Sequence, residues 1–171
     1  ILLILAVAVS CLISCDFLEQ YPTTSISDDI AYGSEESLEA GIIGCYGSLQ
    51  GNPSWQGEFT EYVSLASGLI RWKSSRSTEN WTQTLTMSMF PRNTKNEATY
   101  SWLYASIYKC NKLIESLVDS PVDAAFKDEI EAEARLIRAI DYFMLVRLYG
   151  DVPLITVTAK NIEEMGQPRT L

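Results

Sequence analysis

The chain has 171 residues, of which 47% are hydrophobic, and a formal net charge of −9, so we expect one globular domain or part of one. No run of Lys and Arg offers a basic surface to a phosphate backbone, which argues against nucleic-acid binding. Histidine is absent, so the chain lacks the commonest general base and the commonest metal ligand in proteins.

The first segment, residues 1–14, is apolar and uncharged. At about 1.5 Å per helical residue it is too short to span the ~30 Å hydrocarbon core of a bilayer. Its length is typical of the hydrophobic region of an export signal. No starting Met and no basic segment precede it, so we expect a signal peptide that lacks its first residues.

Residues 12–15, Leu-Ile-Ser-Cys, resemble the lipobox at which lipoprotein signals are cut. The resemblance implies that Cys15 becomes a diacylglyceryl-modified N-terminus with several acyl chains, because one chain alone binds a membrane only marginally. Cys11 is a weaker alternative, and an ordinary secretory signal with an incidental cysteine is another. Residues 15–33 follow with little periodicity and predict an extended tether.

Two helices are expected at the start of the body, residues 34–171. The first begins at Ser34, a good N-cap, and its apolar stripe comprises Leu38, Ile42, Tyr46 and Leu49. Three glycines weaken this helix but could admit close helix contact; they are Gly41, Gly44 and Gly47. The second helix covers about residues 56–67, with Phe59, Tyr62, Val63 and Ala66 on one side, and stops at Gly68.

Two cysteines of the body lie on apolar helix stripes, Cys45 three residues after Ile42 and Cys110 three after Ile107. Neither belongs to a C-x-x-C pair, so we expect no zinc site and no metal or other cofactor. Buried free thiols are the main prediction for this pair. A disulfide is the alternative if the protein is exported.

Residues 69–95 show no clean periodicity and are rich in Ser and Thr. Long irregular segments in compact domains are usually functional or disordered, and two tryptophans argue against plain disorder. Sugars offer apolar faces and hydroxyl rims, which proteins meet with aromatic rings, amides and guanidinium groups. We therefore predict ligand contacts from Trp72, Trp81, Asn80, Arg71, Arg76 and Gln83. The alternative is that both tryptophans fold back into the core and the segment merely connects two helices.

A third helix should begin between Thr94 and Glu97, which form a capping-box pattern. Its apolar face includes Leu103 and Ile107. Asn111 is a polar exception on that face, and we expect a neighbouring backbone group to satisfy it. The fourth and longest helix should open at Ser120-Pro121.

The fourth helix should end at Tyr149, because Gly150 suits its C-cap. One apolar face holds Ile137, Ile140, Met144 and Leu148, and a second holds Leu136, Ala139, Phe143 and Val146. Such a wide apolar arc predicts a central helix packed on more than one side. Structural ion pairs are expected between Glu131 and Arg135 and between Arg138 and Asp141, and a short strand over residues 154–158.

No constellation of catalytic residues is found. Without histidine, no Ser–His–Asp or Cys–His arrangement exists in the chain, and no glycine-rich phosphate loop follows a strand. The paired carboxylates at Glu35-Glu36 and Asp28-Asp29 lie at a helix start and in the tether. We expect a protein that is not an enzyme.

Residues 132–154 read AEARLIRAIDYFMLVRLYGDVPL. This segment closely resembles a signature of the SusD/RagB family, outer-membrane lipoproteins that capture nutrients for a partner transporter. Residues 17–22 are similar to the run that follows the lipidated cysteine in that family. The resemblance implies an all-α fold of tetratricopeptide-like helical repeats, with antiparallel helices and long loops. Residues 34–171 would form the N-terminal part of the family's longer helical domain.

The function implied by the resemblance is binding without chemistry. The protein would be lipid-anchored in the outer membrane and exposed at the cell surface. There it would capture an oligosaccharide and pass it to a SusC-like, TonB-dependent transporter. The family has no fixed ligand motif to carry over, and residues 67–69 read Ser-Gly-Leu where members often carry Asp. The alternative is a helical-repeat lipoprotein scaffold that binds a protein partner and no glycan.

Overall fold

The computed structural model describes residues 32–50, 58–71, 79–86, 88, 90, 92–159 and 168–170. The expected signal peptide, Cys15 and the tether up to residue 31 lie outside these residues. The described part contains five helices and one two-stranded sheet, which confirms a mostly helical fold. None of the helices in these ranges is long and apolar enough to cross a membrane.

The helices and strands have the following bounds. The helices are α3 (Glu35–Gly47), α4 (Glu58–Ala66), α5 (Glu79–Leu85), α6 (Thr94–Ser116) and α7 (Ala124–Tyr149). The strands are β1 (Val152–Pro153) and β2 (Arg169–Thr170), which pair antiparallel with Val152 opposite Thr170.

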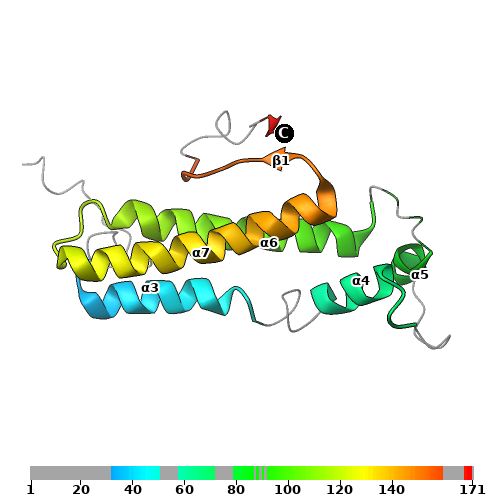
Figure 1. Ribbon diagram of the computed structural model, residues 1–171, viewed down its shortest axis with the longest axis horizontal. Coiled ribbons are helices and arrows are strands. Elements are labelled where there is room, and N and C mark those ends of the chain that lie inside the picture. The colour runs from blue at the N-terminus through cyan, green and yellow to red at the C-terminus, as the bar shows by residue number, and fades with distance from the viewer. Residues whose placement is uncertain are drawn as a thin grey trace, which may run out of the picture.

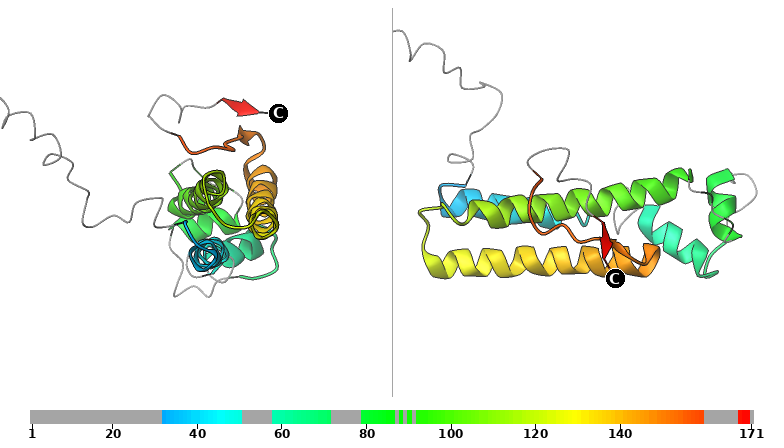
Figure 2. Two further views of the ribbon diagram at one scale, coloured as in Figure 1. Left: turned by 90° about the vertical axis from the view of Figure 1, so that its left-hand side faces the viewer. Right: turned by 90° about the horizontal axis from the view of Figure 1, so that it is seen from above.

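The two longest helices, α6 and α7, form an antiparallel hairpin along the molecule (Figure 1). Helix α3 lies beside both of them and runs parallel to α7, so the three helices form a triangle when seen end-on (Figure 2). Helices α4 and α5 lie at the end of the hairpin where α6 begins and α7 ends (Figure 1). The segment after α7 returns over the hairpin on the side away from α3.

Helix α3 begins as predicted. The hydroxyl of Ser34 accepts a hydrogen bond from the backbone of Ser37, whose own hydroxyl accepts one from the backbone of Ser34. The contact face differs from the expected stripe, because Cys45 is buried whereas Tyr46 is 41% exposed. This face points between α6 and α7, and Cys45 lies closer to its centre than Tyr46 does.

Only one of the three glycines in α3 marks a close helix contact. A Cβ atom at Gly41 would lie 2.9 Å from Cδ1 of Leu113 in α6, so the Leu113 side chain would have to shift to admit one. Gly44 and Gly47 have no such neighbour within 4 Å. Gly41 is therefore the glycine of α3 at which this helix packs closely against α6.

Helix α4 buries Phe59, Tyr62 and Leu65, whereas Val63 is 38% exposed. It stops at Gly68, whose φ of 75° suits glycine, as predicted. The prediction of an irregular segment over residues 69–95 is wrong in part, because α5 forms within it. A helix of seven residues shows too little periodicity to be found from sequence.

Helix α6 begins at Thr94, within the predicted range, whereas α7 begins at Ala124 rather than at Ser120-Pro121, and both caps differ from the predicted ones. Asn93 caps α6 in place of Thr94, since its side-chain oxygen accepts from the backbone of Lys95 and Asn96. Asp123 caps α7 in place of Ser120. Ser120 is buried instead and donates its hydroxyl hydrogen to the carbonyl of Tyr32 at 3.0 Å.

The core runs along the inner faces of the three long helices. One buried cluster joins α3, α6 and α7 and comprises Leu38, Ile42, Cys45, Cys110, Leu113, Leu117, Ile130, Ala134 and Ile137. A second cluster, at the other half of the hairpin, comprises Leu103, Ile107, Leu145 and Val152. Helix α7 packs against both α3 and α6, as predicted for a central helix. Its second apolar face is largely exposed among the described residues: Leu136, Phe143 and Val146 are each more than half exposed, and the Arg147 guanidinium lies 5.3 Å from the centre of the Phe143 ring.

Helix α7 ends at Gly150, as predicted, with a φ of 71°. The strand expected over residues 154–158 does not form, and β1 lies just before it. The reason is that side chains of α6 and α7 form hydrogen bonds with the backbone N–H and C=O groups of this segment, which a neighbouring strand would otherwise need.

Candidate functional site

Side chains of the α6–α7 hairpin hold the extended segment that follows α7. The hydroxyl of Tyr104 donates to the carbonyl of Pro153 at 2.7 Å. The hydroxyl of Tyr142 donates to the carbonyl of Ile155 at 2.9 Å and accepts from the amide of the same residue at 2.6 Å. Both polar groups of the Ile155 backbone are thus satisfied by one side chain.

Three further side chains complete this attachment. The Asn111 amide donates to the carbonyl of Ile155 at 3.0 Å, which confirms that a neighbouring backbone satisfies it. The Arg138 guanidinium donates to the side-chain oxygen of Asn111 at 2.6 Å and to the carbonyl of Thr156 at 3.1 Å. The Glu115 carboxylate accepts from the backbone amide and the hydroxyl of Thr158.

These bonds correct one predicted ion pair and confirm the other. Arg135 and Glu131 are paired on the surface of α7 as expected. Arg138 is committed to Asn111 and Thr156 rather than to Asp141. On a helix, i and i+3 side chains can meet, but Asp141 points into the core while Arg138 reaches over its edge.

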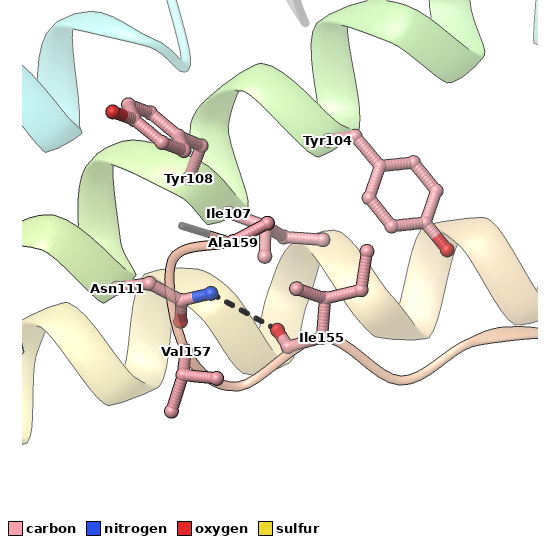
Figure 3. A pocket seen from close by; sticks show the side chains of 7 residues that line it. All are labelled: Tyr104, Ile107, Tyr108, Asn111, Ile155, Val157 and Ala159. Atoms are coloured by element: carbon pink, nitrogen blue, oxygen red, sulfur yellow. Dashed lines mark hydrogen bonds between the residues drawn. The ribbon is translucent and has the colours of Figure 1, made fainter. Parts of the chain in front are cut away.

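A pocket of about 170 Å³ lies between α6 and this extended segment (Figure 3). It is lined by Tyr104, Ile107, Tyr108, Asn111, Ile155, Val157 and Ala159. Its main hydrogen-bonding groups are already engaged, since Asn111 bonds Ile155 and Arg138, and Tyr104 bonds Pro153. The pocket fits an apolar group better than a sugar, whose hydroxyls need polar partners.

Only some of the predicted sugar-binding residues belong to the part of the chain that the structure describes. Trp72 and Arg76 fall outside the described ranges. Arg71 is exposed just beyond α4. Trp81, Asn80 and Gln83 come together on α5.

Trp81 is only 8% exposed and packs with Tyr62 and Leu65. The ammonium group of Lys95 lies 4.9 Å from the centre of its ring. The indole thus fastens α5 to α4 and to the first turn of α6. It can meet a ligand only with the small surface that it leaves exposed.

The two amides on α5 also have structural partners. Asn80 donates to the hydroxyl of Thr94 at 2.8 Å, and its carbonyl accepts from the Asn93 side chain at 2.9 Å. The side-chain oxygen of Gln83 accepts from Asn93 at 3.2 Å. Asn93 therefore caps α6 and holds α5 with the same side chain.

Asp141 of α7, which the sequence predicted to pair with Arg138, is a buried polar group instead. Asp141 is fully buried, and neither carboxyl oxygen has a hydrogen-bond partner among the described residues. The hydroxyl of Ser106, also buried, faces it without a hydrogen bond of normal geometry. Burial raises the pKa of the Asp141 carboxyl to about 6, and the nearby hydroxyl opposes this rise. The signal in the sequence was an Asp within an apolar helix, which we took for an ion pair.

Among the described residues, no group of three or more acidic or cysteine side chains could hold a metal ion. The arrangement offers hydrogen-bonding and aromatic groups, and it does not combine a nucleophile with a base.

Comparison with known proteins identifies the family. A family model described as "Starch-binding associating with outer membrane" matches residues 16–169, which is most of the chain. The chain belongs to the SusD-like family. In this chain, the segment 132–154 that resembles the family signature has a structural role, because Arg138 and Tyr142 form hydrogen bonds with the residues that follow Gly150.

Individual SusD-like relatives agree with this assignment. A SusD-like protein of Bacteroides ovatus is 27% identical over 98% of this chain and 30% of its own length. SusD-like protein P2 of Formosa agariphila is 25% identical over 90% of this chain and 30% of its own length. The chain thus spans about 30% of these relatives. No solved structure gives a significant match.

Proposed function

We propose that this SusD-like protein captures an oligosaccharide at the bacterial surface and passes it to a SusC-like, TonB-dependent transporter. The observation that carries the proposal is the match of residues 16–169 to a starch-binding, outer-membrane-associated family. Capture and transfer break no bond, so they need no catalytic group and no cofactor.

The proposal includes a lipid anchor. Residues 1–14 act as the export signal, and Cys15 carries the acyl chains that hold the protein to the outer membrane. Residues 15–33 then separate the membrane from the helical body. The antiparallel pairs formed by α3, α6 and α7 support the further proposal that the body is built on tetratricopeptide-like repeats.

The ligand site proposed here is the segment between α4 and α5. It runs from Arg71, an exposed residue beyond the end of α4, to Glu79 at the start of α5, which Trp81 fastens to the core. Trp72 and Arg76 lie between these ends, so an aromatic ring and a guanidinium group are available for a sugar. Asn80 and Gln83 contribute less, since their side chains already hold α5.

Glycan affinity of the chain from Asp16 onward tests both function and site. We expect starch oligosaccharides or another glycan to bind, and Trp72→Ala to weaken binding by at least about tenfold. Phe90→Ala is the matched control, because it removes a 62% exposed aromatic ring outside the proposed site. An unchanged affinity in Trp72→Ala would contradict the site.

The alternative function is a scaffold for a protein partner. It is favoured by one observation, the exposed apolar face of α7 formed by Leu136, Phe143 and Val146. Absence of binding to every glycan on a broad panel, together with capture of a protein through this face, would support the scaffold over the glycan-binding proposal.

A further inference from the structure

Two cysteines, Cys45 of α3 and Cys110 of α6, lie in the same buried cluster between these helices. The helices run antiparallel, and Gly41 of α3 lies against Leu113 of α6. One helical turn further along α3 is Cys45, and one turn back along α6 is Cys110. The register set by Gly41 therefore brings these cysteines opposite each other.

Both thiols lie in the same buried cluster, with exposures of 1% for Cys45 and 0% for Cys110. Both are free thiols in the structure, as predicted, and each shifts the pKa of the other. Thiols that interact in this way need only a small movement to reach bonding distance, and two helices that pack closely at a glycine suit the short Cα separation of a disulfide.

The two thiols differ in reactivity. Interaction with the Cys110 thiol lowers the pKa of Cys45, and the ammonium of Lys109 also lowers it. The same interaction and burial raise the pKa of Cys110. Lys109 lies at the edge of a hollow of about 160 Å³ at the end of α3, where it donates to the hydroxyl of Ser48 at 3.1 Å. Cys45 is thus the sulfur that reacts first.

We propose that Cys45 and Cys110 form a disulfide that joins α3 to α6. The oxidant is a disulfide compound or a thiol–disulfide oxidoreductase. The Cys45 thiolate attacks one sulfur of the oxidant, which forms a mixed disulfide and releases one thiolate. The Cys110 thiolate then attacks the sulfur of Cys45, closes the protein disulfide and releases the second thiolate. The two protons of the cysteines end on the two released thiols.

The cross-link has a structural consequence for the rest of the chain. The loop that it closes contains α4 and α5, together with the segment between them. It would limit the freedom of that loop in the unfolded chain and keep α3 and α6 together when the molecule opens locally.

The test is the equilibrium between this pair and glutathione. The full chain is used with Cys11→Ser and Cys15→Ser, so that only the two buried thiols remain. The oxidised fraction is measured at several ratios of reduced to oxidised glutathione by alkylation and mass spectrometry of the cross-linked peptide. We expect disulfide formation to be favoured at least about tenfold more in native buffer than in denaturing urea, because the fold holds the sulfurs together.

Single-cysteine variants test the order of the steps. Cys110→Ser should accumulate glutathione on Cys45, whereas Cys45→Ser should leave Cys110 unmodified. Gly41→Ala should weaken disulfide formation by crowding Leu113 where α3 packs on α6, and Gly44→Ala, which meets no atom within 4 Å, is its control. If the native and denatured equilibria are equal, or both thiols remain open to alkylation in oxidising buffer, the proposal is wrong.

Discussion

Peptide groups after α7 are satisfied by individual side chains rather than by a neighbouring strand. Pro153 cannot donate a hydrogen bond, so it limits the ladder at β1. Beyond it, the Tyr142 hydroxyl bonds both the amide and the carbonyl of Ile155. Arg138 and Asn111 bond each other as well as this segment, so the loss of one side chain affects the others.

Tyr142→Phe should lower the free energy of unfolding by about 1–3 kcal/mol, because it leaves a partly buried amide without its partner and removes one partner of the carbonyl. Urea unfolding measures the change. Tyr108→Phe is the control, since this ring is 56% exposed, and it should change stability by less than about 0.5 kcal/mol. Equal effects of the two substitutions would contradict the role given to Tyr142.

Asp141 makes stability depend on pH. Its pKa is about 6 in the folded chain against an ordinary value of 3.8, so the folded state holds the proton more tightly than the unfolded state does. The contribution of Asp141 to stability should be fully present below about pH 4 and be lost as pH rises to about 6, by roughly 2–3 kcal/mol in all. Urea unfolding at a series of pH values measures this fall.

Asp141→Asn should remove most of that fall and raise stability above pH 7, because the amide carries no charge to bury. Asp151→Asn changes an exposed carboxylate and should leave the pH profile unaltered. A profile that rises with pH in this range, or that is the same in Asp141→Asn, would show that Asp141 is ionised and satisfied in the fold.

Residue type alone predicted the helix ends correctly, but it did not predict the partners of the polar side chains. Glycine at 68 and 150 predicted helix ends correctly, because a positive φ is a local property. The partner of Arg138 could not be predicted, because the choice between Asp141 and Asn111 depends on which side of α7 faces α6. Burial of Asp141 follows from the same packing and was missed for the same reason.

At the scale of helices and strands, the sequence offers more than one possible N-cap residue near the starts of α6 and α7. Asn and Asp are at least as good at this position as Thr and Ser. The structure uses Asn93 and Asp123, and the Ser120 hydroxyl bonds Tyr32 instead. The sequence thus predicted both helices and the start of α6, but it placed the N-cap of α6 about one residue too late and that of α7 about three residues too early.

Asn93→Ala should be costly because this side chain serves two helices. It caps α6 and also donates to the carbonyl of Asn80 and the side chain of Gln83 on α5. We expect a loss of about 1–3 kcal/mol of stability. Ser101→Ala, at an exposed position of α6, is the control and should cost less than about 0.5 kcal/mol.

The same variant has a local readout. Amide hydrogen exchange in α5 should become faster in Asn93→Ala than in the parent chain, because α5 loses its attachment to α6. If α5 exchanges at an unchanged rate, then Trp81 alone holds the helix and Asn93 is only a cap.

At the scale of the whole molecule, the sequence predicted a mostly helical body around a long final helix. Helix type and order follow from apolar periodicity along the chain. The sequence could not show which of the two apolar faces of α7 is covered, since that depends on neighbours. In the described chain, Ile137 is buried and Phe143 is more than half exposed.

The candidate site was predicted less well than the fold. Composition suggested that aromatic and amide side chains of residues 69–95 bind a sugar. Trp81 and Gln83 have structural partners that depend on the position of α5, a helix too short to show a periodic pattern. What remains of the site proposal is the segment between α4 and α5, whose α5 end is held to the core by Trp81.

The measurement that tests this account most directly is amide hydrogen exchange with and without a bound glycan. If the segment joining α4 and α5 holds the sugar, protection should increase in peptides covering residues 66–86, while the middle of α7 stays unchanged. Protection confined to residues 154–159, which line the apolar pocket, or to the exposed face of α7 would contradict the proposed site.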